Sequence, residues 1–328
     1  MLNILGIGYF HPPGEIDNQF IEKLDVGTNE QWIVEKIGIL TRRTTLPLEY
    51  IKETKNADPR LSRAVATMSP ADMATRACEM AIKRAGISAS QIGMVICNAC
   101  APDETAPVLS QRVSQRLGIE APGFDVMTAC PAFALHIDFV NNFREEELPE
   151  YVLCFASAAL TQHVNYCDRS DGAIWGDGAS AYVLSARHPG KLQVVDTHFS
   201  ADPTRASAVV VDNYRHFHQD GRAVRDFSVR QTVRLIKRLE EQYQLDWSKD
   251  VFIGHQANAT MLQQITNNRE IPEQSHWHNA ESIGNQAASG APACLGMHWD
   301  EIVPGQRIVV AVVGAGLSWG SVLLEAPR

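Results

Sequence analysis

The sequence predicts an α/β fold in which helices cover β-sheets. Apolar runs of the length of buried strands alternate with helix-like segments from one end of the chain to the other, which is the pattern of sheets flanked by helices. Apolar residues make up 45% of the 328 residues and charged residues 20%, a composition that supports a substantial hydrophobic core. The length allows one large domain or two of ordinary size.

Nine short apolar runs bounded by turn-forming residues are expected to be strands. They cover residues 4–8, 94–97, 123–127, 151–157, 179–185, 192–198, 251–254, 307–313 and 321–325. Five helices are expected between them, at 68–85, 107–117, 131–146, 224–243 and 260–267. In the first helix, Ala and Met recur at spacings of three and four residues, and Asp72 falls in the first turn, where a carboxylate is favoured.

The middle of the chain marks a boundary between two halves. It carries the breakers Pro189-Gly190 and Asp202-Pro203 and few strong helix formers. We therefore divide the chain into two domains, residues 1–185 and 186–328. A charged stretch in the first half, 46–65, is expected to be a helical excursion on the surface, with a lid or a partner contact as the alternative.

Charge and composition exclude several classes of protein. The 29 basic and 38 acidic residues give a net charge of −9, which argues against nucleic-acid binding. No run of about 18 apolar residues exists, so no membrane span is expected. The N-terminus does not resemble a signal peptide, and the seven cysteines are odd in number and scattered. Reduced thiols in the cytoplasm are therefore expected.

Cys130 is the first candidate for chemistry. In the segment 124–133, FDVMTACPAF, an apolar strand ends at a turn of small residues that presents Cys130, and a helix is expected to begin at Pro131. A helix N-terminus lowers the pKa of a thiol and favours the nucleophilic thiolate. An inert buried cysteine is the alternative.

Two polar turns and two glycine-rich segments complete the set of candidates, and one of these segments, WGDGAS at 175–180, leads into an expected strand. His255 stands at the carboxyl end of an expected strand in FIGHQAN, where ligands gather in α/β sheets. Asn285 lies in SIGNQAASG, whose small residues leave room for a ligand. The segment 313–320, VGAGLSWG, lacks the dinucleotide-binding pattern, but its bare backbone N–H groups can hold an oxyanion. A structural histidine and a packed turn are the alternatives for His255 and Asn285.

The order of these segments carries more information than any one of them. TAC, GDGAS, GHQAN, GNQAAS and GAGLSWGS follow one another as in the ketoacyl synthase III family of the thiolase superfamily, which this chain resembles. Residues 30–39, EQWIVEKIGI, resemble that family's (D/E)-x-W-I-x-x-(R/K)-x-G-I segment. The resemblance spans nearly the whole chain. It implies a five-layered α-β-α-β-α fold built from two similar halves, usually assembled as a homodimer.

The resemblance also implies a reaction. Cys130 would take an acyl group from a thioester, because acyl-sulfur bonds stay reactive enough to be attacked again. His255 and Asn285 would hold the carbonyl of a malonyl thioester while decarboxylation gives an enolate. The backbone N–H groups of Cys130 and Ala315 would form a second oxyanion hole. The product would be a β-ketoacyl thioester.

Substrate-binding residues follow from the same resemblance. Trp32 and Arg169 would stack on the two faces of the adenine of coenzyme A, and Lys36 would lie near the nucleotide phosphates. Ala106 stands where family members that use acetyl primers carry a phenylalanine that closes the partner's acyl pocket, so a bulkier acyl group is expected. Ordinary surface residues are the alternative for each of these positions.

Two departures indicate a specialised lipid or polyketide synthase. The first departure is Ala106 at the acyl-pocket position. The second is Thr260, which replaces a basic residue implicated in docking of the acyl carrier protein. Docking would then rely on other cations of the expected helix, namely Arg230, Arg234, Lys237 and Arg238.

The expected partners are acyl-CoA or acyl-carrier-protein thioesters and malonyl-acyl carrier protein, with no nucleic acid and no membrane. No cofactor and no metal are expected, since His216, His218, His276 and His278 fit no standard zinc spacing. Two alternatives stay open: an acyltransferase that passes the acyl group from Cys130 to a non-malonyl acceptor, and an inactive partner subunit.

Overall fold

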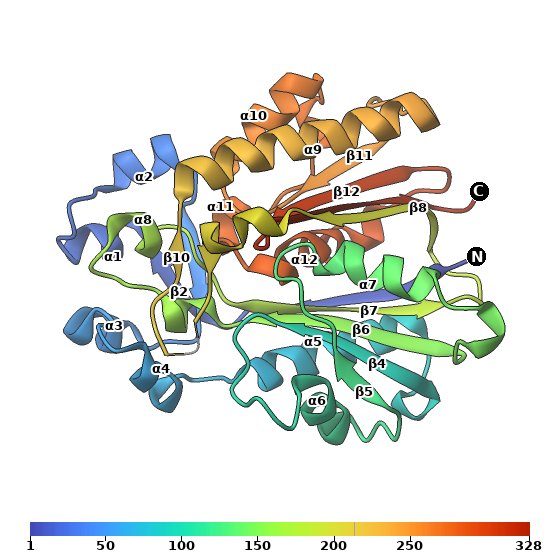
Figure 1. Ribbon diagram of the computed structural model, residues 1–328, viewed down its shortest axis with the longest axis horizontal. Helices are drawn as coiled ribbons and strands as arrows, with labels where there is room; N and C mark the ends of the chain where they lie inside the picture. The colour runs from blue at the N-terminus through green and yellow to red at the C-terminus, as the bar shows by residue number, and fades with distance from the viewer. Residues whose placement is uncertain (213) are drawn as a thin grey trace.

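The computed structural model describes residues 1–212 and 214–328, and within them nine strands form one mixed sheet (Figure 1). Their spatial order is β11-β12-β13-β8-β1-β7-β6-β4-β5. The strands are β1 (Asn3–Phe10), β4 (Ile92–Ala99), β5 (Gly123–Asp125), β6 (Tyr151–Ala158), β7 (Gly178–Ser185), β8 (Leu192–Ala201), β11 (Val251–Gly254), β12 (Arg307–Gly314) and β13 (Ser318–Glu325). These are the nine strands that the sequence predicts, with ends that differ by a few residues.

The sheet consists of two sets of strands with mirrored order. They meet at β1 and β8, which pair only through Asn3↔Gln193 and Ile4↔Leu192. Outward from this junction, each set has two antiparallel pairings followed by a parallel one. One set comes from the chain up to Ser185 and the other from Leu192 onward. This arrangement supports a division at residues 185 and 186, and that division into two domains stays a prediction.

Helices complete five layers (Figure 1). Helices α5 (Pro70–Ala85) and α6 (Leu109–Leu117) cover one outer face, and α9 (Gly221–Tyr243) and α10 (Ala259–Arg269) cover the other. Between the two strand sets lie α7 (Ala132–Asn141) and α12 (Gly290–Met297). Each central helix packs on the strands of the other half, α7 on β8 and β13, and α12 on β1 and β7. The α-β-α-β-α layering that the family resemblance implies is confirmed.

Helix α5 shows how local sequence builds this packing. Ser69 and Asp72 form a capping box at its N-terminus, and Gly86 ends it with a φ of 70°, a left-handed conformation that glycine adopts without strain. The helix lies very close to β1, because a Cβ at Gly8 would come within 2.1 Å of the carbonyl oxygen of Ala77. The glycines of β1 therefore let α5 approach the sheet.

The sequence does not predict several short elements individually, although two of the helices fall in the helical excursion expected at 46–65. The helices are α1 (Asn18–Lys23), α2 (Glu30–Lys36), α3 (Leu48–Thr54), α4 (Pro59–Val65), α8 (Arg169–Gly172) and α11 (Ala280–Ile283), together with α12. The strands are β2 (Gly14–Asp17), β3 (Thr41–Thr44), β9 (Val209–Val210) and β10 (His218–Gln219). Helix α12 has no polar face because it is buried on all sides, so it shows no amphipathic period. The stretch 46–65 forms α3 and α4, which confirms the helical excursion.

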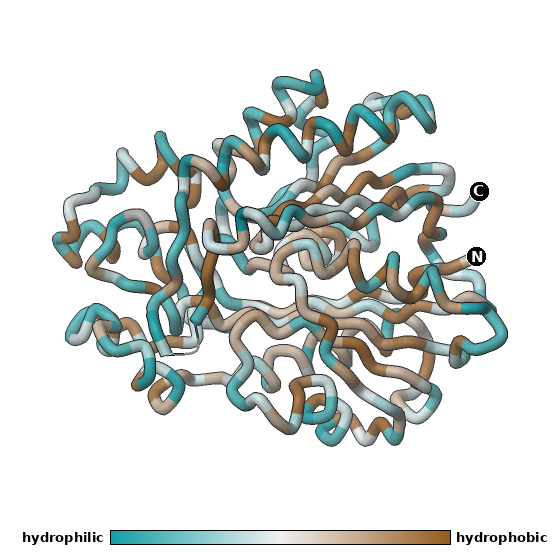
Figure 2. Tube along the Cα trace, in the orientation of Figure 1, coloured by the Kyte–Doolittle hydropathy of each residue, from teal (hydrophilic) through white to brown (hydrophobic). Residues whose placement is uncertain are grey.

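Hydrophobic residues follow the sheet and the central helix α7, whereas hydrophilic and hydrophobic residues alternate along α9 (Figure 2). This is the expected distribution for a helix that covers one outer face of a sheet. In the described part of the chain, no helix is long and apolar enough to cross a membrane.

Candidate active site

Cys130 lies on a sharp turn between β5 and α7. Ala129, the preceding residue, has a φ of 55°, which is uncommon for a residue with a side chain. Two bonds fix the turn to β4: Val126 N donates to Cys97 O at 2.8 Å, and Thr128 N donates to the buried Asn98 Oδ1 at 2.9 Å. The turn is therefore held in a tight conformation by the neighbouring strand.

The loop after β12 packs directly on Cys130. The backbone N–H groups of Cys130 and Ala315 lie near the Cys130 sulfur and act to lower the pKa of its thiol. A Cβ at Gly314 would lie 2.8 Å from Cys130 Cβ and 2.7 Å from Pro131 Cδ, so only glycine allows this approach. The loop therefore brings the N–H group of Ala315 next to that of Cys130 beside the sulfur.

The pKa of the Cys130 thiol differs from the sequence-based expectation, which was a lowered value. Burial raises it well above its usual range, and the nearby Cys100 adds to the rise, whereas the N–H groups of Cys130 and Ala315 act in the opposite direction. The expectation was wrong, because burial destabilises the thiolate more than the two N–H groups and the helix terminus stabilise it.

His255 follows the last residue of β11 and is 7% exposed. Burial lowers the pKa of His255 to about 4, so the imidazole is neutral at pH 7 and donates from one nitrogen only. Its Nδ1 is buried without a hydrogen-bond partner among the described residues. A neutral ring with the proton on Nε2 is therefore suited to donate to a carbonyl oxygen.

Gln256 orients the turn that carries His255, and sequence reasoning did not single it out. Its Nε2 donates to Gly254 O at 2.8 Å, and its Oε1 accepts from Asn279 N at 2.8 Å. The glutamine thus ties the end of β11 to the start of the segment that contains Asn285. Its place in the GHQAN motif was the available signal.

Asn285 lies between α11 and α12 with its amide fixed in one orientation. Its Oδ1 accepts from Ala287 N at 2.9 Å, which leaves the Nδ2 group as the donor for a ligand. The backbone is held on both sides, because Asn285 N donates to Ile174 O at 2.9 Å and Gly176 N donates to Asn285 O at 3.0 Å.

The GDG motif supports this loop and takes no direct part in the site. A Cβ at Gly176 would lie 2.2 Å from Ile283 O, and one at Gly178 would lie 2.1 Å from Gln286 Nε2. Between them, the buried Asp177 carboxylate accepts four hydrogen bonds of 2.6 to 2.8 Å from the backbone and hydroxyl groups of Thr45 and Thr161. The glycines permit close packing of the Asn285 loop, and the aspartate joins three segments behind it.

A cavity of about 340 Å³ brings these side chains together. Its lining includes six of the residues that the sequence singles out: Cys130, His255, Asn285, Ala315, Trp32 and Lys36. Sequence reasoning missed other lining residues, among them Trp175, Val209, Phe217, Gln219 and Arg225. Those residues carry no recognisable motif, and only the fold brings them to this wall.

Trp32 and Arg169 are in contact with each other. The guanidinium carbon of Arg169 lies 4.9 Å from the centre of the Trp32 ring, and Arg169 Nη1 donates to Gly27 O at 3.2 Å. In helix α2, Asn29 caps the N-terminus by accepting from Trp32 N. The structure thus places the expected adenine-binding pair together at the edge of the cavity.

Other expected residues lie elsewhere. Ala106 is exposed on the loop between β4 and α6, outside the cavity lining of this chain, so its expected effect requires a second chain and stays a prediction. Arg230 and Arg234 are exposed on α9. Arg238 was wrongly expected to be a free docking cation, because it forms an ion pair with Asp196 and also bonds Ser321.

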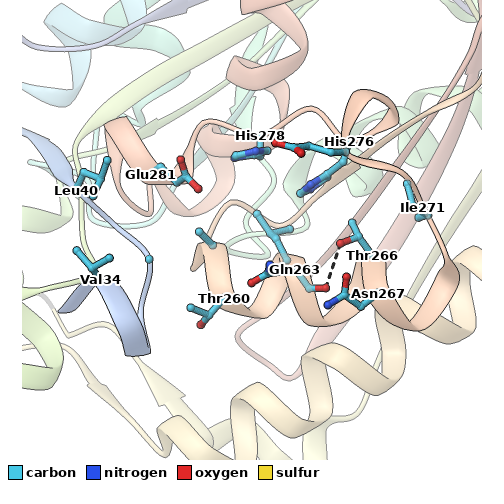
Figure 3. Close-up of a pocket in the computed structure, with 14 residues that line it drawn as sticks. Val34, Leu40, Thr260, Gln263, Thr266, Asn267, Ile271, His276, His278 and Glu281 are labelled. Atoms are coloured by element: carbon cyan, nitrogen blue, oxygen red, sulfur yellow. Dashed lines mark hydrogen bonds between the residues drawn. The ribbon is translucent and has the colours of Figure 1, made fainter. Parts of the chain in front are cut away.

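A second cavity, of about 530 Å³, is lined by Val34 of α2, by α10 and by the segment that follows it (Figure 3). Gln263, Thr266 and Asn267 of α10 face it from one side, and His276 and His278 from the other. The two imidazole rings stack with centroids 4.8 Å apart. Within residues 1–212 and 214–328, no three His, Cys, Asp or Glu side chains are grouped so that they could hold a metal ion.

Comparisons with known proteins agree with this geometry. The family described as 3-oxoacyl-[acyl-carrier-protein (ACP)] synthase III matches residues 124–203, and its C-terminal part matches residues 244–326. The beta-ketoacyl-[acyl-carrier-protein] synthase III of Chlamydia caviae is 29% identical over 98% of this chain and 96% of its own length.

Solved structures agree as well. The 3-oxoacyl-[acyl-carrier-protein] synthase III from Aquifex aeolicus has a TM-score of 0.87 and 25% identity, with 99% of this chain and 100% of that one covered. The priming beta-ketosynthase of the R1128 polyketide pathway has a TM-score of 0.83 and 23% identity, with 100% and 97% covered; at this identity it shows the fold alone.

The fold is thiolase-like, and the site is of the kind found in condensing enzymes, which transfer acyl groups. The chain belongs to the 3-oxoacyl-[acyl-carrier-protein] synthase III-like family.

Proposed function

We propose that this chain is a β-ketoacyl synthase of type III that uses Cys130 as its nucleophile and condenses the acyl group with a malonyl thioester. The observation that carries the proposal is the meeting of Cys130, His255 and Asn285 on one cavity. Cys130 comes from the connection between β5 and β6, whereas His255 and Asn285 come from the connection between β11 and β12. Their side chains supply a nucleophile and two hydrogen-bond donors.

In the first half-reaction, the Cys130 sulfur attacks the carbonyl carbon of an acyl thioester. The N–H groups of Cys130 and Ala315 stabilise the oxyanion that forms. The bond to the original sulfur breaks, and that sulfur leaves as a thiol with the proton from Cys130. The acyl group remains on Cys130 as a thioester, which is still reactive toward a carbon nucleophile.

In the second half-reaction, a malonyl thioester binds with its carbonyl oxygen between His255 Nε2 and Asn285 Nδ2. The bond to the carboxylate breaks and carbon dioxide leaves, and the electron pair forms an enolate whose oxygen receives both hydrogen bonds. The enolate carbon attacks the acyl-cysteine carbonyl. The bond to the Cys130 sulfur breaks, and a β-ketoacyl thioester is released. The sulfur leaves as a thiolate, which takes up one proton from solvent to restore the thiol.

Acyl-CoA or acyl-carrier-protein thioesters and malonyl-acyl carrier protein are the proposed partners. Trp32, Lys36 and Arg169 lie where the carrier of the thioester would enter the cavity. Arg230, Arg234 and Lys237 are the exposed cations of the expected set that remain for docking an acidic carrier protein, after Arg238 is removed from that set. Lys237 also forms an exposed ion pair with Glu241.

The curated relative from Chlamydia caviae favours fatty-acid synthesis as the setting of the reaction. A specialised lipid or polyketide role rests on the departures at Ala106 and Thr260 and stays a prediction. Thr260 itself donates to Lys36 O at 3.0 Å, so this position holds α2 in place instead of carrying a charge.

A homodimer is part of the proposal. The three-residue strand β5 lies at one end of the sheet order and carries the Cys130 turn, so its outer edge is the place where a second chain would complete the site. Light scattering on the purified protein checks this, with about twice the mass of one chain as the expected result and the mass of one chain as the contrary one.

Intact-protein mass spectrometry tests the reaction. The protein is incubated with acyl-CoAs of increasing chain length, then with malonyl-acyl carrier protein. We expect a mass gain that maps to Cys130 and disappears as a β-ketoacyl product forms. An adduct that malonyl donors leave intact would support the acyltransferase alternative, and no adduct with any donor would support an inactive subunit.

A further inference from the structure

Trp175 presents an unpaired hydrogen-bond donor in the wall of the active-site cavity. The residue is 6% exposed and lines the same cavity as Cys130. Its indole Nε1 is buried and has no hydrogen-bond acceptor among the residues that the structure describes. An indole nitrogen donates a hydrogen bond and cannot accept one, so only an acceptor can offset the free-energy cost of burying it.

Buried indole N–H groups normally have a partner, because an unsatisfied donor keeps the full cost of leaving water. Ile174, Val209 and Phe217, which line the same cavity, are apolar. The ring of Phe217 packs against the indole with centroids 4.5 Å apart and an interplanar angle of 66°. The donor is thus a polar atom in an otherwise apolar part of the wall.

The position of Trp175 is fixed relative to the candidate catalytic side chains. Its backbone forms a parallel β-bridge with Asn285, and Trp175 and Cys130 belong to the same hydrophobic cluster. An acyl chain on Cys130 that extends into the cavity would therefore pass this wall. A ligand atom would reach the buried Nε1 only if the ring of Phe217 moved aside.

We propose that Trp175 selects acyl groups that carry a neutral oxygen on the chain, such as a hydroxyl or keto group, by donating a hydrogen bond from Nε1. The inference rests on the proposed function, because the chain must be bound to Cys130. A neutral oxygen fits better than a carboxylate, because an ionised group would be desolvated among Ile174, Val209 and Phe217.

Acylation of Cys130 by four-carbon donors tests the inference. The donors are butyryl-CoA, 3-hydroxybutyryl-CoA, 4-hydroxybutyryl-CoA and acetoacetyl-CoA, with rates followed by quenched mass spectrometry. We expect kcat/KM for at least one oxygenated donor to exceed that for butyryl-CoA about tenfold or more. In Trp175→Phe, which keeps the aromatic ring and loses the N–H, this ratio falls to about one.

Trp299→Phe is the matched control. Trp299 is as buried as Trp175, at 5% exposure, but it packs against Lys191 outside the cavity, so its variant keeps the wild-type ratio. A second measurement needs no change at Trp175: Cys130→Ala protein should bind the preferred oxygenated donor more tightly than butyryl-CoA, by a similar factor. This covers the case in which Trp175→Phe does not fold.

Equal rates for all four donors in the wild type would overturn the inference and leave the proposed function intact. A preference that persists in Trp175→Phe would also overturn the inference. The indole N–H would then be interpreted as donating to the face of the Phe217 ring. Absence of acylation by every donor would instead contradict the proposed function.

Discussion

The guanidinium of Arg169 lies over the ring of Trp32, 4.9 Å from its centre. The two residues are far apart in the sequence, on α8 and α2, and the contact closes one edge of the cavity that holds Cys130. Any flat ring that enters between them has to move Arg169 from Trp32 and break its hydrogen bond to Gly27 O. Trp32 and Arg169 are therefore already stacked on each other, and a flat ring could bind between them only after they separate.

This contact predicts a specific loss in Trp32→Ala. Stacking of one base on an aromatic side chain contributes about 1–3 kcal/mol, so KM for acyl-CoA should rise about tenfold or more. KM for the corresponding acyl-pantetheine, which has no adenine, should stay within about twofold. Steady-state kinetics with the two donors checks this, and an equal rise for both would place the adenine elsewhere.

Asn285→Ala should separate the two half-reactions. Removing one donor from an oxyanion hole typically lowers the rate about 100- to 1,000-fold, and Asn285 Nδ2 is proposed to act only on the malonyl carbonyl. We expect normal acylation of Cys130 by mass spectrometry and a large fall in carbon dioxide release from malonyl-acyl carrier protein. Asn267→Ala, an exposed residue of α10, is the control. Wild-type condensation in Asn285→Ala would remove Asn285 from the mechanism.

Gly314→Ala should displace the nucleophile. The added Cβ would lie 2.8 Å from Cys130 Cβ, a distance that forces one of the two segments to move. We expect the acylation rate to fall at least about tenfold, because small errors in placement are costly in active sites. Gly172→Ala is the matched control, since its nearest neighbour would lie at 3.4 Å. An unchanged rate in Gly314→Ala would show that the loop adapts freely.

The raised pKa of Cys130 predicts slow alkylation that keeps accelerating with pH. The thiolate is the reactive species, so the rate with iodoacetamide should rise about tenfold per pH unit through pH 9 without a plateau. Peptide mass spectrometry assigns the modified residue, with the exposed Cys167 as the internal comparison. A plateau below pH 8 would show that the helix terminus and the two N–H groups outweigh burial.

His136 predicts a loss of stability in acid. Burial lowers its pKa from 6.5 to about 4, so the unfolded state binds more protons between these values. Its contribution is complete above pH 6.5 and is lost as the pH falls toward 4, with a size of about 3 kcal/mol. Carboxyl groups such as Asp171, whose pKa burial raises to about 7, act in the opposite sense.

The comparison of wild type with His136→Gln isolates this effect. Urea unfolding at pH 7 and pH 4.5 should show a smaller acid loss in the variant than in the wild type. The exposed His218→Gln serves as the control. Equal losses in wild type and His136→Gln would mean that His136 stays neutral in the unfolded state as well, or charges without cost in the folded one.

The sequence anticipates the elements with a strong local pattern. All nine strands of the sheet are readable as short apolar runs, and α5 is readable from its apolar period and from Asp72 in its first turn. Helix α12 is not readable, because a helix buried on every side has no amphipathic face. The ion pair of Arg238 is not readable from the sequence either. Its partner Asp196 is 42 residues away, and no local rule connects the two residues.

The sequence by itself determined the α/β class, the strands, and the candidates Cys130, His255 and Asn285. Cys130 and His255 follow expected strands, and Asn285 lies in a turn rich in small residues. Only the tertiary structure decided that these three residues share a cavity with Trp32 and Lys36. It also decided that burial raises the pKa of the Cys130 thiol and that Trp175, in the wall of the cavity, has a buried N–H group without a partner. Burial and contact depend on what packs around a residue, and those neighbours are supplied by distant parts of the chain.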